Sequence, residues 1–172
     1  VTRWREDSTR DNWGSFVYVR DVRSGTVWSA GHQPVGSKPQ SYEVAFSEDK
    51  ADFWRRDSGV VTHLEVIVSA EDNAEMRRVS VANYSTRPRE IELTSYAEVV
   101  LGPRADDLAH PAFANLFIET EYHAPHSALF ARRRPRSAQD EAKWGVHVLS
   151  TSAATIAGIQ FETDRSRFLG RG

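Results

Sequence analysis

Residues 90–99 have the sequence EIELTSYAEV, in which apolar or small side chains alternate with polar ones. Ile91 and Leu93 belong to the first set, and Glu92 lies between them. A period of two residues is typical of a β-strand that has one face in a core and the other toward water. This stretch therefore predicts a half-buried strand.

A second stretch, residues 60–68, is rich in β-branched residues and is interrupted only by Thr62, His63 and Glu65. This composition predicts a more deeply buried strand. Strand-like patterns also occur at residues 15–21, 42–46, 52–56, 75–82, 113–122, 128–133, 145–150 and 155–162. About ten short strands separated by turn residues predict an all-β fold, a β-sandwich.

Helical signals are few. Residues 104–109 and 136–143 are each compatible with one helical turn, and Pro111 is expected to end the first of them. Neither segment has a sustained apolar stripe. The chain is therefore predicted to contain little helix.

Length and composition limit the classes of function. The chain has 172 residues, 40% of them hydrophobic, no Cys and a net charge of -2. Without Cys there is no disulfide framework and no thiolate chemistry. The nearly neutral charge gives no basic field for nucleic acid, and no run of residues is apolar enough for a membrane span. We expect no nucleic-acid partner and no cofactor.

The ends of the chain indicate a fragment. The first residue is Val1, the one Met is Met76, and the chain stops in ordinary charged sequence. No linker divides residues 1–172. We therefore expect a single β-sandwich domain, residues 1–172, excised from a longer chain.

Metal-binding and catalytic motifs are weak. Of the six His residues, only His123 and His126 lie close together, and no carboxylate at metal-ligand spacing accompanies them. The carboxylates of Glu119 and Glu121, two residues apart on a predicted strand, could form a catalytic pair or could simply face water. We predict no metal site and no catalytic residue.

Aromatic residues give the clearest indication of a ligand. Five Trp and five Tyr occur, and aromatic faces with Arg, Asp and Gln nearby are typical of carbohydrate sites. The segment that best combines these residue types contains Arg20, Asp21, Trp28 and Gln33, our candidate carbohydrate-binding residues. Trp is also favoured in protein cores, so packing is the alternative explanation.

Several short phrases occur in a characteristic order. They include Tyr18-Val19-Arg20-Asp21, Val27-Trp28-Ser29, Thr94-Ser95-Tyr96-Ala97-Glu98 and His110-Pro111-Ala112-Phe113. Their order resembles the N-terminal β-sandwich of glycoside hydrolase family 94, formerly glycosyltransferase family 36. Other phrases, such as Trp28-Ser29-Ala30-Gly31 and the segment 164–171, are similar to the large cyclic β-1,2-glucan synthases of that family.

The resemblance implies a β-supersandwich like that of the galactose mutarotase superfamily. It also implies that the general acid and most phosphate contacts lie on a following (α/α)6 barrel outside this chain. The fragment would be a soluble, non-catalytic domain that packs on that barrel, lines part of a β-glucan or oligosaccharide cleft and supports a homodimer. The parent would be a bacterial inner-membrane protein with this region in the cytoplasm.

Two other functions stay open. The first is a stand-alone carbohydrate-binding module for β-glucan, which would use the Trp28 region. The second is an aldose mutarotase or epimerase, which needs a His and a carboxylate in one pocket for proton transfer. His63 with Glu65, or His110, are the candidates for that chemistry.

Overall fold

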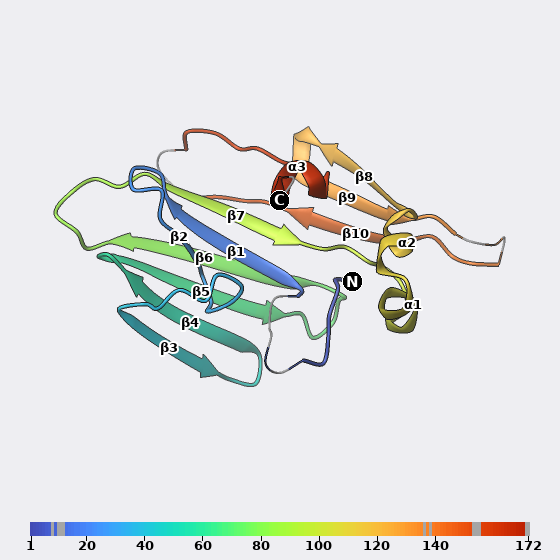
Figure 1. The fold of residues 1–172 in the computed structure, drawn as a ribbon, viewed down its shortest axis with the longest axis horizontal. Helices are drawn as coiled ribbons and strands as arrows, with labels where there is room; N and C mark the ends of the chain where they lie inside the picture. Colours follow the sequence, from blue (N-terminus) through green and yellow to red (C-terminus); the bar gives the residue numbers. More distant parts are fainter. Residues whose placement is uncertain (8, 10–12, 136, 138, 153–155, 171–172) are drawn as a thin grey trace. The chain divides into compact units, whose positions relative to one another are not determined.

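The computed structural model describes residues 1–7, 9, 13–135, 137, 139–152 and 156–170, shown as a coloured ribbon in Figure 1. Contacts divide the chain into two compact units. One unit is Arg5–Glu98, which we call the sandwich unit. The other, Val1–Trp4 with Val99–Gly172, we call the terminal unit. A single domain over residues 1–172 stays a prediction.

The sandwich unit consists of two antiparallel sheets (Figure 1). The first has the strand order β2-β1-β7, and the second has the order β3-β4-β5-β6. The strands are β1 (Ser15–Asp21), β2 (Val27–Ser29), β3 (Ser41–Phe46), β4 (Lys50–Asp57), β5 (Val60–Val68), β6 (Glu75–Asn83) and β7 (Ile91–Ala97).

The core of the sandwich unit lies between these sheets. Its buried apolar side chains are Val17, Val19, Trp28, Ala30, Val60 and Leu64. Trp28 is 3% exposed, and its indole Nε1–H donates a 3.4 Å hydrogen bond to the Thr62 hydroxyl of the opposite sheet. Burial of apolar surface between two alternating faces is what holds such sheets together.

The alternation predicted for residues 90–99 is present, but the apolar side chain of Leu93 is less buried than expected. Leu93 lies opposite Val19 in the register of β1 and β7, so it is on the core side of its sheet. It is nevertheless 45% exposed. The reason is that β7 is an edge strand of its sheet, in which β1 is the strand that pairs with it among the described residues.

The terminal unit has one three-stranded antiparallel sheet, with the order β10-β9-β8. Its elements are α1 (Arg104–Ala109), α2 (Pro111–Asn115), β8 (Ile118–His123), η1 (Ala124–His126), β9 (Ala128–Arg133), β10 (Lys143–Val148) and α3 (Arg165–Leu169). The buried guanidinium of Arg3 binds the carboxylate of Asp107 at 2.9 Å, which fixes the first residues of the chain to α1.

Most strand predictions are confirmed, and three assignments in the terminal unit are wrong. The helical turn expected at 104–109 is confirmed as α1, which ends before Pro111. The strand expected at 113–122 begins only at Ile118, because Pro111 also starts α2. Residues 156–162 of the strand expected at 155–162 form no strand, and residue 155 lies outside the described residues. The described residues of 136–143 form no helix, whereas residues 136 and 138 lie outside the description.

Most of the regular structure is strand, in antiparallel sheets, so the all-β fold class is confirmed. The likeness to galactose mutarotases stays a prediction. A bilayer crossing needs about 20 apolar helical residues, and the helices formed by the described residues fall short of that requirement.

Candidate functional site

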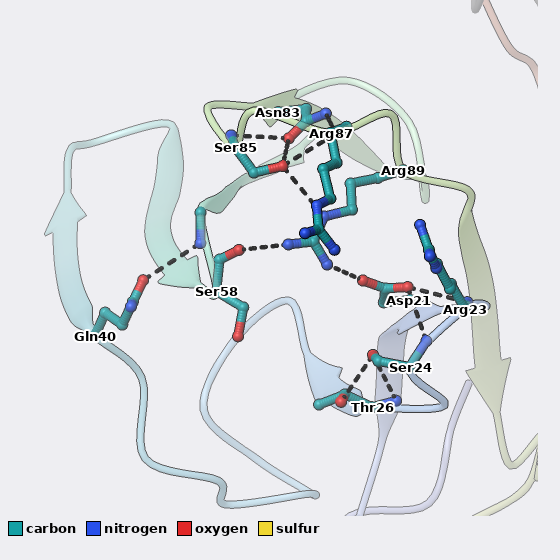
Figure 2. A network of polar contacts seen from close by, with 11 residues as sticks. Asp21, Arg23, Ser24, Thr26, Gln40, Ser58, Asn83, Ser85, Arg87 and Arg89 are labelled. Atoms are coloured by element: carbon teal, nitrogen blue, oxygen red, sulfur yellow. Dashed lines mark hydrogen bonds and ion pairs between the residues drawn. The ribbon is translucent and has the colours of Figure 1, made fainter.

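Asp21 lies at the centre of a polar network at one end of the sandwich unit (Figure 2). Its carboxylate accepts hydrogen bonds from the backbone N–H groups of Arg23 at 3.0 Å and Ser24 at 3.2 Å, and from the guanidinium of Arg89. The Ser24 hydrogen bond and, next, the Arg89 guanidinium lower the pKa of Asp21. Asp21 is 3% exposed, so its carboxylate serves these internal contacts.

Arg89 connects three turns of the sandwich unit (Figure 2). Besides binding Asp21, its guanidinium donates to the Ser58 carbonyl oxygen at 3.1 Å and to the Ser85 hydroxyl at 3.2 Å. A planar guanidinium can make these contacts at once because its donors point in fixed directions. The network therefore holds the loops at this end of the unit together.

The four candidate carbohydrate-binding residues do not converge. Arg20 and Asp21 are successive residues of β1, so they point to opposite faces of the sheet. Arg20 forms an exposed ion pair with Glu92 at 3.2 Å, whereas Trp28 lies in the core. Gln33 is half-buried in the segment between β2 and β3. Carbohydrate binding by these residues stays a prediction, and the structure gives Asp21 and Trp28 structural contacts.

A different group of side chains gathers on the second sheet. We call this surface the outer face, because its residues alternate along β4 and β5 with the core residues Val60, Thr62 and Leu64. Its members near the middle of the sheet are Glu43, Lys50, Asp52, Trp54, Arg56, Val61, His63, Glu65 and Arg78.

An ordered polar cluster occupies part of the outer face. His63 Nε2 lies 2.9 Å from Asp52 Oδ1, and the His63 ring stacks on Trp54 with a centroid distance of 4.7 Å and an angle of 10°. Lys50 Nζ lies 3.0 Å from Asp52 and 3.6 Å from Glu65. The His63 contact and then the Lys50 contact lower the pKa of Asp52, whereas Asp52 raises the pKa of Lys50.

Asp52, His63 and Glu65 also bring potential metal-ligand atoms within 4.8 Å of one another. A carboxylate–imidazole set of this kind could hold a divalent cation. Lys50 already places an ammonium between the two carboxylates. Arg78 Nη1 lies 3.3 Å from the other carboxylate oxygen of Glu65, so two cationic side chains neutralise the two carboxylates, and a metal ion would have to displace Lys50.

The mutarotase candidates are only partly brought together. His63 and Glu65 share the outer face, and Asp52 adds a carboxylate in hydrogen-bond contact with His63. His110 lies in the other unit, between α1 and α2. A shallow depression of about 260 Å³ on the outer face is lined by Trp54, with neighbours from β3, β4 and β5 that do not include His63.

The terminal unit contains the other pairs singled out from the sequence. His123 and His126 lie with their Nδ1 atoms 2.9 Å apart, but among the described residues no third ligand completes a metal set with them. Glu119 forms an exposed ion pair with Arg134 at 3.3 Å, and Glu121 is exposed on the same strand. These contacts are those of solvated surface side chains.

Of the outer-face cluster, His63 and Glu65 were singled out from the sequence, but their partners Asp52 and Lys50 were missed, although a signal for the pairing exists. Ser58 and Gly59 have φ values of 48° and 82°, so the turn between β4 and β5 is a two-residue hairpin turn with positive φ at both positions. A turn at this point fixes the register, which places Trp54 opposite His63 and Asp52 opposite Glu65.

Acid should destabilise the sandwich unit through Asp21 and Asp52. A carboxyl whose pKa is lower in the folded state stabilises the fold above its ordinary pKa of 3.8, and that contribution is lost as the pH falls toward the folded-state value. We expect the urea midpoint to fall steeply below about pH 4. The double variant Asp21→Asn with Asp52→Asn should have a lower urea midpoint than the unmodified chain at pH 6. Its urea midpoint should then change less as the pH falls. Asp72→Asn, in the exposed β5–β6 turn, is the matched control. If the urea midpoint fell equally with pH in the unmodified chain, the double variant and Asp72→Asn, this expectation would be wrong.

Comparison with known proteins gives one family. All of residues 1–172 match the family model described as "Glycosyl hydrolase 94, supersandwich domain". The match covers both compact units, and the all-β architecture agrees with the description.

Three curated relatives illustrate the similarity. The chain is 37% identical over 172 residues to the cyclic beta-(1,2)-glucan synthase NdvB of Rhizobium meliloti (strain 1021), covering 100% of this chain and 6% of that protein. It is 29% identical over 129 residues to the N,N'-diacetylchitobiose phosphorylase of Vibrio furnissii, covering 72% and 16%. It is 26% identical over 155 residues to the solabiose phosphorylase of Paenibacillus borealis, covering 90% and 19%. The chain thus spans less than a fifth of each relative.

Proposed function

Since this chain belongs to glycoside hydrolase family 94 as its supersandwich domain, we propose that it is a non-catalytic module of a cyclic β-1,2-glucan synthase or a related glycoside phosphorylase. The module packs on an (α/α)6 catalytic barrel outside this chain and lines part of its carbohydrate cleft. It also contributes to a homodimer. The parent is a bacterial inner-membrane protein with this region in the cytoplasm.

One observation carries this proposal. The whole chain matches a supersandwich domain, and it covers only 6% to 19% of relatives whose names state a synthase or phosphorylase activity. Most of the sequence of those relatives therefore lies outside the region that this chain matches. The internal pairing of Asp21, Asp52 and Glu65 with basic side chains further supports a structural role for these carboxylates.

Phosphorolysis tests the proposal. A phosphate oxygen forms a bond to the anomeric carbon of a terminal glucosyl unit as the glycosidic C–O bond breaks. The shortened glucan is released with a proton on its freed oxygen, and the other product is glucose 1-phosphate. We expect no glucose 1-phosphate above background when residues 1–172 alone are incubated with linear β-1,2-glucan and phosphate. The complete gene product should release it, and the same product lacking residues 1–172 should lose activity or fail to fold.

Two outcomes would contradict the proposal. Release of glucose 1-phosphate by residues 1–172 alone would show that the chain is catalytic. Full activity of the complete product without these residues would show that the barrel does not need the module. Polarimetry of freshly dissolved α-D-glucose checks the mutarotase alternative, and we expect the uncatalysed rate.

A further inference from the structure

The depression on the outer face has the features of a small ligand site. It has a volume of about 260 Å³, and its lining includes Trp54, Glu43, Arg56 and Val61. Drug-sized ligands occupy pockets of roughly 300–1,000 Å³. The depression is therefore suited to one ring of a larger molecule that extends along the surface.

Trp54 is held in place before any ligand arrives. One face of the indole is covered by the His63 ring, and His63 is in turn fixed by Asp52, which is 5% exposed. A stacked ring has a second face, and Trp54 also lines the depression. An aromatic surface that is already oriented loses little conformational entropy on binding.

The charged side chains beside Trp54 favour a neutral ligand. Glu43 lies opposite Trp54 on β3, and Arg56 follows two residues along β4, so both share the outer face with the indole. Both side chains are exposed, and both line the depression. A carboxylate accepts and a guanidinium donates hydrogen bonds, and the two charges cancel. An anionic ligand would meet Glu43, whereas a polyhydroxylated neutral ring could use both groups.

We propose that this depression binds one pyranose ring of a neutral oligosaccharide. Trp54 packs on the C–H surface of the sugar, whose partial positive charge complements the negative face of the aromatic ring. Glu43 and Arg56 hydrogen-bond its hydroxyl groups. The inference rests on the proposed place of the chain in a carbohydrate-active enzyme, and it places the sugar at residues other than Arg20, Asp21, Trp28 and Gln33.

A titration of ¹⁵N-labelled residues 1–172 with sophorose, a β-1,2-linked disaccharide of glucose, tests the proposal. We expect a saturable shift of the Trp54 indole Nε1–H signal, identified with Trp54→Phe, and a dissociation constant on the order of 1 mM. Sorbitol, which has hydroxyl groups but no ring, should leave the signal in place. Glucose 1-phosphate release plays no part in this readout, so the site and the proposed function can fail separately.

Variants give the decisive comparison. Calorimetry should show binding at least tenfold weaker in Trp54→Ala, and about three- to tenfold weaker in Glu43→Gln and Arg56→Met. Trp144→Ala, which removes a 57% exposed Trp from the terminal unit, should bind as the unmodified chain does. The Glu43 and Arg56 variants alter exposed groups, so they decide the question if Trp54→Ala does not fold. Unchanged binding in those two variants, or no saturable Trp54 shift at about 20 mM sophorose, would overturn the proposal.

Discussion

Replacing Arg55 with Met should lower the free energy of unfolding by about 3–5 kcal/mol. Arg55 is 1% exposed, and its guanidinium binds both carboxylate oxygens of Asp57, at 2.7 and 3.0 Å. It also donates to the carbonyl oxygens of Gly31 at 3.1 Å and Ser37 at 2.9 Å. Met keeps most of the apolar stem but leaves these partly buried acceptors without their donor, and the loss of a charged donor from such a site is costly.

This substitution should first destabilise the segment that connects the two sheets. Gly31 and Ser37 belong to the segment that leads from β2 in one sheet to β3 in the other. We therefore expect faster amide hydrogen exchange in residues 31–37 of the Arg55→Met variant, in addition to a lower urea midpoint. Since domains are stable by only about 5–15 kcal/mol, a fraction of the variant could be unfolded without denaturant.

Arg56→Met is the matched control for Arg55→Met. Arg56 is the next residue of β4, so it points to the outer face, where it is exposed and lies 5.9 Å from the Tyr84 ring centroid. Exposed substitutions of this kind change stability by about 0.5 kcal/mol. A loss below about 1 kcal/mol in Arg55→Met, or equal losses in both variants, would show that the buried guanidinium does not hold the connection.

Local patterns in the sequence predicted much of the sandwich unit. The strands at residues 15–21 and 60–68 were predicted with their observed bounds, because their alternation or β-branched content is a local property. The register of β4 and β5 could also have been derived, since a turn at Ser58-Gly59 sets it. From that register follow the outer-face pairs, including Trp54 with His63.

Contacts between distant loops could not be predicted in this way. Asp21 and Arg89 are 68 residues apart, and nothing near either residue identifies the other as its partner. Asp21 was instead grouped with Arg20 because the two are adjacent in sequence, although adjacent strand residues point to opposite faces. The segment near Pro111 was missed for a related reason, since a proline can end one helix or begin the next.

Trp28 was the hardest of the candidate residues to place, since β2 has only three residues and shows no period of its own. Its packing predicts that Trp28→Ala lowers the free energy of unfolding by about 3–5 kcal/mol, because the side chain is 3% exposed and its removal leaves a cavity between the sheets. Trp28→Phe should cost less, since it keeps an aromatic ring and loses the Nε1–H bond to Thr62. Urea denaturation measures both losses. The control is the exposed Trp144→Ala, which loses the contact of its ring with Arg132 and is expected to cost below about 1 kcal/mol. If Trp28→Ala instead kept full stability and lost sophorose binding, Trp28 would be a ligand-contacting residue, and the core described for this unit would be wrong.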